Sequence, residues 1–241
     1  MPHDCQQRII APSMLAADWS RVAEECRRAE TSGGDWLHLD IMDGHFVDNL
    51  SFGPQFVSIV RPCTELFLDV HLMITNPDHY FPRFVKAGAE NITVHVEADH
   101  DVSRTLAGIR EAGCRCGLAL NPDTAFEEVL PYLDQIDLLL VMTVRPGFGG
   151  QAFMEEETMP KVASARAERE RRGLGYHIEV DGGIDQRTAP IATRHGANVL
   201  VAGTSLFGAS DMAAAIGACE KGDSGASRLP WRIIKDSVMR A

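Results

Sequence analysis

The sequence lacks the features that tie a chain to a membrane or to an oxidising compartment. No apolar run is long enough to span a bilayer, and the first seven residues do not contain the apolar core of a secretory signal. The six cysteines include no Cys-x-x-Cys pair, so we expect reduced thiols and a cytoplasmic location.

Positive charge is scarce as well. The chain has 23 Lys and Arg residues against 34 Asp and Glu residues, which gives a net charge of −11. This balance argues against a nucleic-acid groove and against binding to an anionic membrane surface. A small anionic substrate would need a local cradle within this acidic surface.

Short apolar segments alternate along the chain with amphipathic segments. Such alternation predicts a parallel sheet covered by helices. The expected strands are Arg8–Ser13, Trp36–Asp40, Leu66–Met73, Asn91–His95, Cys116–Leu120, Leu138–Thr143, Tyr176–Asp181 and Asn198–Ala202. The expected helices are Ser20–Thr31, Pro54–Val60, Asp78–Ala87, Asp101–Ala112, Phe126–Leu130, Pro160–Arg172, Thr188–His195 and a last one within Ser210–Lys221.

Eight such units favour an α/β fold that closes into a single (β/α)8 TIM barrel, although an open doubly wound sheet gives similar local signals. We expect residues 1–221 to form one barrel domain. Residues 222–241 begin with a Gly- and Ser-containing stretch and are expected to be a linker and C-terminal tail.

The segment from Leu37 to Phe46 is the most informative of the sequence. Strand alternation places His38, Asp40 and Met42 on one face, opposite three aliphatic residues. A buried sheet face carries an imidazole and a carboxylate only if they are paired, bound to a metal or used in chemistry. This segment alone fits a hydrogen-bonded core histidine equally well.

Other predicted strands end in polar residues too, and the active site of a barrel lies at the carboxyl ends of its strands. Ser13 ends the first strand, and His71 and Asp181 end the third and seventh. His38, Asp40, His71 and Asp181 are therefore expected to converge and to bind zinc, iron, manganese or cobalt. Asp69, Glu179 and His95 are expected to orient these ligands or to form buried ion pairs.

Three glycine-bearing turns follow the last three strands. They are 146–151, 181–184 and 202–205. Glycine lets backbone amides approach an anion, and the loops after strands 7 and 8 of a barrel often bind phosphate. Each turn alone fits a simple tight turn, but together they favour a phosphorylated substrate. The 146–151 loop is also a candidate lid.

Three methionines, Met42, Met73 and Met142, fall at strand ends. Methionine at such positions is usually core filler. If these side chains face the site, they form an apolar wall that keeps it dry.

These residues together resemble the ribulose-phosphate 3-epimerase family. The matching segments are 10–18, 37–46, 69–73, 141–144, 146–151 and 179–184. The resemblance implies metal ligands at His38, Asp40, His71 and Asp181, with Asp40 and Asp181 also acting as the acid/base pair. It implies substrate contacts at Ser13, His71, Gly147, Phe148, Gly149, Gly150, Asp181, Gly182, Gly183, Gly203 and Thr204.

The resemblance further implies epimerisation at carbon 3 of D-ribulose 5-phosphate, one divalent metal ion, no organic cofactor and a homo-oligomer. The reaction belongs to the pentose phosphate pathway and the Calvin cycle. The chain departs from the family pattern at Thr204, where Ser is common, at Asp48, where Pro is usual, and at Arg145. Arg145 either adds charge near the phosphate or points to solvent.

Three other functions remain open from the residues. A six-carbon ketose phosphate such as allulose 6-phosphate is a close rival substrate. A lyase of similar outline would typically place a lysine near the ends of strands 2 and 3, whereas Lys86 and Lys161 fall on predicted helices. A catalytically silent sugar-phosphate binder is disfavoured by the intact set of predicted ligands.

Overall fold

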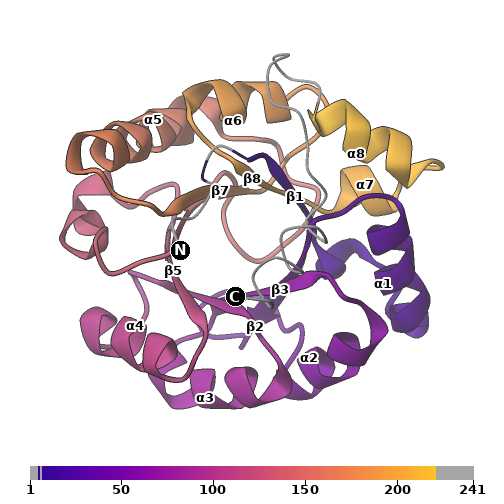
Figure 1. Ribbon diagram of the computed structural model, residues 1–241, viewed down its shortest axis with the longest axis horizontal. Helices are drawn as coiled ribbons and strands as arrows, with labels where there is room; N and C mark the ends of the chain where they lie inside the picture. The colour runs from indigo at the N-terminus through magenta and orange to yellow at the C-terminus, as the bar shows by residue number, and fades with distance from the viewer. Residues whose placement is uncertain (1–4, 6, 221–241) are drawn as a thin grey trace, which may run out of the picture.

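The computed structural model describes residue 5 and residues 7–220, and its strands form one eight-stranded parallel sheet. Figure 1 shows the strands as an inner ring with the helices outside it. The strands are β1 (Ile9–Pro12), β2 (Trp36–Met42), β3 (Phe67–Met73), β4 (Asn91–His95), β5 (Arg115–Leu120), β6 (Leu138–Met142), β7 (His177–Asp181) and β8 (Val199–Ala202).

Neighbouring strands pair in the order β1-β8-β7-β6-β5-β4-β3-β2. A parallel bridge between Ser13 and His38 joins the two ends of this order, so the sheet closes on itself. The predicted (β/α)8 TIM barrel is confirmed, and the open doubly wound sheet is excluded. The described helices include none long and apolar enough to cross a membrane.

The helices of the described chain lie on the outside of the ring. They are α1 (Val22–Thr31), α2 (Pro54–Val60), α3 (Pro77–Ala87), α4 (Val102–Glu111), α5 (Glu155–Arg172), α6 (Ala189–His195), α7 (Thr204–Phe207) and α8 (Met212–Glu220). Local chemistry sets several of their ends. The Asp101 side chain accepts a hydrogen bond from Arg104 N at the start of α4, and Gly88 ends α3 in the left-handed conformation.

The strands separate two apolar cores. The larger core lies between the strands and the helices and includes Leu37, Leu39 and Ile41 of β2. The smaller core fills the inside of the barrel, with Trp36 and Phe67 among its members. Strand alternation thus sends one set of side chains outward and the other inward. The inner set changes from apolar to polar along β2, where Trp36 is followed by His38 and Asp40.

The structure corrects the expected helices in three places. Phe126–Leu130 is not an α-helix but belongs to two 3-10 turns, Phe126–Glu128 and Leu130–Tyr132, because Pro131 has no N–H to continue an α-helical ladder. α5 begins at Glu155, five residues before the expected start at Pro160, with three glutamates in its first turn. The short α7 was not predicted, and the predicted linker and tail at 222–241 lie outside the described residues.

The inside of the barrel leaves no room beside Gly117 of β5. A Cβ atom there would lie 3.0 Å from Thr93 Cβ and 3.2 Å from Leu138 Cδ2. We therefore expect Gly117→Ala to lower the free energy of unfolding by about 1–3 kcal/mol through overpacking, measured by denaturant unfolding. Gly175→Ala, at a position with open space around it, is the control and is expected to stay within about 0.5 kcal/mol. If Gly117→Ala were as stable as Gly175→Ala, the interior beside Gly117 would not be tightly packed.

Candidate active site

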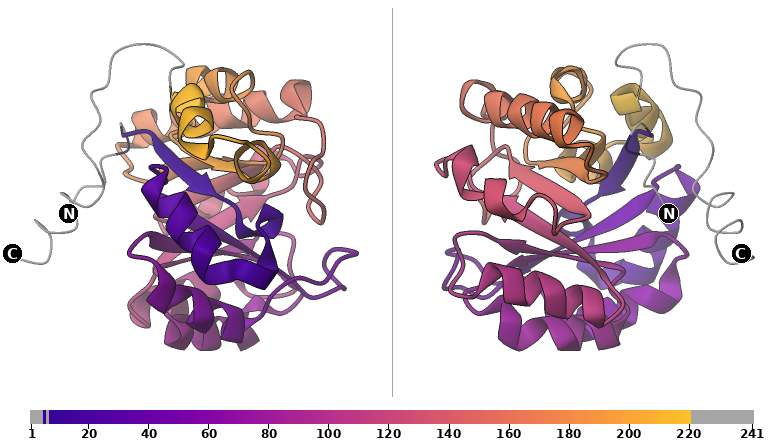
Figure 2. Two further views of the ribbon diagram at one scale, coloured as in Figure 1. Left: turned by 90° about the vertical axis from the view of Figure 1, so that its right-hand side faces the viewer. Right: turned by 60° about the vertical axis from the view of Figure 1, so that its left-hand side comes forward.

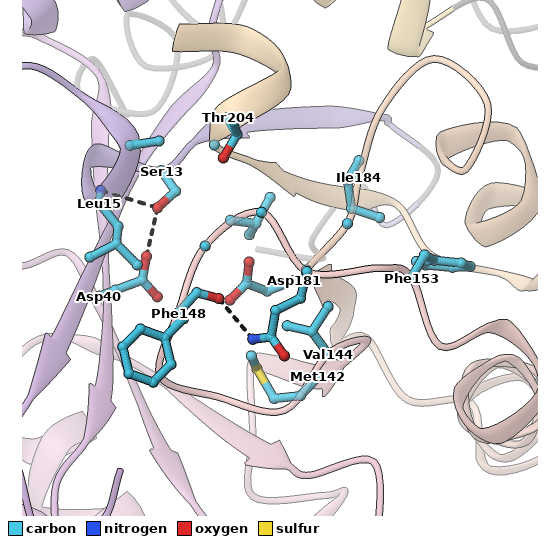
Figure 3. A pocket seen from close by; sticks show the side chains of 18 of the residues that line it. Ser13, Leu15, Asp40, Met142, Val144, Phe148, Phe153, Asp181, Ile184 and Thr204 are labelled. Carbon is cyan, nitrogen blue, oxygen red and sulfur yellow. Dashed lines mark hydrogen bonds between the residues drawn. The ribbon is translucent and has the colours of Figure 1, made fainter. Parts of the chain in front are cut away.

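A cavity of about 610 Å³ opens at the carboxyl ends of the strands. Figure 2 shows the loops that follow β2 and β6 projecting at this end of the barrel. The wall of the cavity combines strand-end residues such as Asp40 and Asp181 with the three glycine-bearing turns predicted from the sequence. Figure 3 shows both carboxylates directed into this space, with Thr204 on another side of it.

Four predicted ligands meet beside this cavity. His38 and Asp40 come from β2, His71 from β3 and Asp181 from β7, and one donor atom from each lies within 4.8 Å of the others. The register of β2 on β3 places Asp40 directly beside His71. The two histidines are fully buried behind the cavity wall, whereas Asp40 and Asp181 line it. The structure therefore brings the carboxylates, but not the His71 imidazole, to the cavity surface.

The hydrogen bonds of His38 show which ring nitrogen is available for a ligand. Its Nδ1 lies 2.7 Å from Asp69 Oδ2, and the other oxygen of Asp69 accepts a hydrogen bond from Asn91. A carboxylate only accepts, so His38 Nδ1 carries the proton and donates it. Nε2 is therefore the ring nitrogen that is available to a metal ion. Burial lowers the pKa of His38, but the Asp40 and Asp69 carboxylates outweigh it and raise that pKa well above its usual value. This buried Nε2 has no hydrogen-bond partner among the described residues.

Asp40 is the carboxylate that faces both imidazoles. Its Oδ1 lies 3.2 Å from His38 Nε2 and 3.2 Å from His71 Nδ1, while its Oδ2 accepts a 2.6 Å hydrogen bond from the Ser13 hydroxyl. An acceptor oxygen opposite an unpartnered lone pair requires a cation or a proton between them. The two imidazoles and two carboxylates fit a divalent transition metal, because these are the ligand types that such ions prefer.

Burial and neighbouring charge push the two aspartates of this group in opposite directions. Burial raises the pKa of Asp181 to about 7, with the Asp40 carboxylate adding to the effect. Burial also raises the pKa of Asp40, but the His38 and His71 imidazoles outweigh it and hold that pKa below its usual range. Two carboxylates with separated pKa values can act as acid and base at one pH.

Two further acidic groups lie on the far side of His38. Glu179 Oε1 is 3.7 Å from His38 Nδ1, and Asp69 is hydrogen-bonded to the same nitrogen. Burial, together with Asp69, raises the pKa of Glu179 well above its ordinary value. Both residues contact His38 from outside the group of four, and whether they orient it or only form buried ion pairs stays a prediction.

Two glycines of the predicted phosphate cradle, Gly182 and Gly183, are required by their surroundings. Gly182 and Gly183 have φ angles of 117° and 66°. A Cβ at Gly182 would lie 2.6 Å from Val144 Cγ1, and one at Gly183 would lie 2.7 Å from the Phe153 backbone nitrogen. Only glycine fits these positions, so the backbone itself forms the cavity wall there. Gly203 and Thr204 line the cavity from the turn after β8.

The loop after β6 is braced on both sides. Asn49 donates a 2.6 Å hydrogen bond to the Gly147 carbonyl, and Gln151 donates to the Phe148 carbonyl, as Figure 3 also shows. Phe148 is 58% exposed, so its ring has space to move toward a ligand. Arg145 pairs with Asp123 on the surface instead of lining the cavity. Lid closure remains a prediction.

The three methionines combine both expected roles. Met42, Met73 and Met142 are almost fully buried, and all three contribute to the cavity wall. Met42 and Met73 pack on Val47 in a small apolar cluster.

Some residues at the site were not found from the sequence. Val144, Phe153 and Arg187 line the cavity. They reach it through loop conformations that depend on distant contacts. Glu97, a polar residue just beyond the strand-ending His95, contacts His71 only through His95.

This arrangement defines a class, the TIM-barrel enzymes with a polar centre and a glycine-lined cavity at the carboxyl ends of the strands. Residues 9–207 match the model of the ribulose-phosphate 3 epimerase family. The chain therefore belongs to the ribulose-phosphate 3-epimerase family, whose members are isomerases.

Sequence relatives support this assignment. Ribulose-phosphate 3-epimerase from Bacillus subtilis is 46% identical over 86% of this chain and 95% of its own. The chloroplastic ribulose-5-phosphate-3-epimerase of Arabidopsis thaliana is 43% identical over 86% and 74% of the two chains. The cytoplasmic isoform of Oryza sativa is 44% identical over 90% and 94%.

Solved structures share the fold at much lower identity. The 3-hexulose-6-phosphate synthase from Salmonella typhimurium matches with a TM-score of 0.64 and 16% identity, over 89% of this chain and 97% of that one. This likeness concerns the fold alone.

The raised pKa of Asp181 leads to a prediction for the chelator-treated protein. An acid whose pKa is higher in the folded state holds its proton while the unfolded chain has lost it, so stability falls as pH rises between the two values. Relative to Asp181→Asn, which cannot ionise, the wild-type protein is expected to lose stability from about pH 4 to about pH 7. Urea unfolding of both proteins across this range measures the difference, and parallel curves would contradict it.

Proposed function

We propose that this protein interconverts D-ribulose 5-phosphate and D-xylulose 5-phosphate by inverting carbon 3. The observation that carries this proposal is the placement of Asp40 and Asp181 on β2 and β7, both lining one cavity beside two buried imidazoles. Membership of the ribulose-phosphate 3-epimerase family supports the substrate.

Inversion next to a carbonyl group requires two proton transfers on opposite faces of one carbon. One carboxylate removes the proton and leaves an enediolate, and the other returns a proton to the far face. Asp40, with its low pKa, is suited to be the ionised base in one direction, and Asp181, with a pKa of about 7, is suited to be the acid. Their roles exchange in the reverse direction.

His38, Asp40, His71 and Asp181 are the residues that would hold a divalent ion of zinc, iron, manganese or cobalt. When bound, such an ion acts as a Lewis acid toward the oxygens next to the reacting carbon. The chain itself holds Asp40 in place through the Ser13 hydroxyl, and Met42, Met73 and Met142 keep water away from the carboxylates.

The phosphate is assigned to the glycine-lined part of the cavity. Gly147, Phe148, Gly149 and Gly150 form one side of it, and Gly182, Gly183, Gly203 and Thr204 form the other. Arg145 takes no part, since it is paired with Asp123 outside the cavity. Backbone amides are therefore the main donors that the glycine turns offer to the anion.

A lyase that uses a cavity lysine is less consistent with this site. The described lining contains no lysine, and the Lys161 ammonium donates to three backbone carbonyls of the loop after β5. A six-carbon ketose phosphate would use the same carboxylates, so only an assay separates it from the five-carbon substrate. The cytoplasmic location and the homo-oligomer stay predictions.

Asp40→Asn tests the chemistry directly. The amide keeps the size of the side chain but cannot take up the proton, so we expect turnover to fall at least about 10²- to 10⁴-fold. Asp48→Asn, which alters an exposed carboxylate in the loop after β2, is the matched control and should keep wild-type turnover. Wild-type activity in Asp40→Asn would overturn the assignment of Asp40.

The substrate and the two-base arrangement are tested by proton NMR of D-ribulose 5-phosphate in deuterated water. We expect deuterium at carbon 3 together with xylulose 5-phosphate, loss of both after chelation, and recovery with zinc, manganese, iron or cobalt. Deuterium at carbon 3 without xylulose 5-phosphate would mean that protons are transferred on only one face of this carbon. If no deuterium enters carbon 3 with any of these ions, D-ribulose 5-phosphate is not the substrate, and the six-carbon ketose phosphate is the next to assay.

A further inference from the structure

We propose that Glu97 is a positioning residue which, through His95, fixes the ring nitrogen that His71 presents to the group of four. The inference rests on the proposed function only in taking His71 as a metal ligand. Glu97 itself touches neither the cavity nor any of the four predicted ligands. Its effect would pass through hydrogen bonds that run from the loop after β4, by way of His95, to His71.

The chain of contacts is short and buried. His71 Nε2 lies 2.8 Å from His95 Nε2, and His95 Nδ1 lies 2.9 Å from Glu97 Oε2. Both imidazoles are 0% exposed, and their rings stack with centroids 5.0 Å apart. Water is therefore not an alternative partner for the ring nitrogens, and the proton positions are set by the chain itself.

The Glu97 carboxylate determines which group donates in each of these hydrogen bonds. Burial raises the pKa of Glu97, but donors on His95, Asn121 and Thr124 outweigh it, so the pKa stays below its usual value. The ionised carboxylate can only accept, so His95 Nδ1 carries a proton. If the His95 ring carries this one proton, it accepts at Nε2, and the proton between the two rings belongs to His71 Nε2.

The consequence appears at the other side of the His71 ring. With its proton on Nε2, His71 presents a lone pair at Nδ1, which lies 3.2 Å from Asp40 Oδ1. His38 directs its Nε2 to the same oxygen atom, because its Nδ1 is bonded to Asp69. Two independent carboxylates, Asp69 and Glu97, thus turn one ring nitrogen of each imidazole toward one point. Metal-bound histidines need this arrangement, and their outer partners strengthen binding.

The second oxygen of Glu97 is also held in place. Oε1 accepts a 2.7 Å hydrogen bond from the Asn121 backbone N–H and another bond from the Thr124 hydroxyl. Lys161 donates to the backbone carbonyls of Asn121 and Thr124, which braces this turn. A backbone N–H can only donate, so whatever group occupies this position must keep an oxygen on the Asn121 side.

That constraint makes Glu97→Gln a sharp test. The amide oxygen has to face Asn121, which directs the amide N–H₂ group to His95 Nδ1. His95 then accepts at Nδ1 and donates from Nε2, so the His71 proton is displaced to Nδ1. There it forms a hydrogen bond to Asp40 and occupies the position of the metal. The substitution therefore exchanges the donor and acceptor roles along these hydrogen bonds without changing the size of the side chain.

Two readouts measure this reversal, and neither uses turnover. Long-range proton–nitrogen NMR of the chelator-treated protein assigns the protonated nitrogen of His71. Competition with a chromophoric chelator gives the affinity for Zn²⁺. We expect Nε2–H in the wild type and Nδ1–H in Glu97→Gln, with zinc binding about 10- to 100-fold weaker in the variant.

Thr124→Val is the matched control. It removes one donor from Glu97 Oε1 but keeps the carboxylate, the Asn121 N–H and the contact with His95. We expect its His71 to keep the proton on Nε2 and its zinc affinity to stay within about threefold of the wild type, since the outer contact to His71 is unchanged.

An Nδ1 proton on His71 of the metal-free wild type would overturn the inference, and this measurement needs no variant to fold. Wild-type zinc affinity in Glu97→Gln would overturn it as well. If the nitrogen assignments and affinities change as expected but the wild type does not epimerise D-ribulose 5-phosphate, the proposed function fails and this inference stands.

Discussion

The structure depends on keeping a group of ionisable side chains inside a barrel. Asp40, Asp69, Glu179 and Asp181 share this interior with the imidazoles of His38, His71 and His95, and nearly all are fully buried. An isolated charge in such surroundings is costly, so each group needs a partner. Nearby residues supply several of these partners: Asn91 donates to Asp69, Ser13 donates to Asp40, and Glu97 is hydrogen-bonded to His95.

The register between β2 and β3 is what makes these partnerships possible. His38 pairs with Asp69 and Asp40 with His71, so each imidazole has a carboxylate beside it on the adjacent strand. A slip of one residue would turn these side chains out toward the helices and bring leucine and valine inward. The apolar outer face, which includes Leu39 and Val70, therefore protects the polar inner face by fixing the register.

The sequence predicted the elements whose signals are local. Strand alternation was enough to place His38, Asp40, His71 and Asp181 on inner faces, and the barrel closure then brings them together. The turn after β7 was predictable because Gly182 and Gly183 occupy conformations that other residues avoid. The 3-10 turns near Pro131 and the early start of α5 were not predicted, although the missing N–H of Pro131 and the glutamates in the first turn of α5 are local signals for them.

The parts of the site that sequence reasoning missed share one property: they join loops that are distant in the chain. Glu97 meets Asn121 and Thr124, and Asn49 meets Gly147, across separations for which spacing gives no signal. These contacts determine the positions of the loops above the buried acidic groups. The negative charge of those groups disfavours an anionic ligand beside them. Asp40 and Asp181 are the two carboxylates of the group whose charge a divalent ion can offset. The glycine turns, to which the phosphate is assigned in the proposed function, offer backbone amides to an anion, and Arg187 is the basic side chain among the residues that line the cavity.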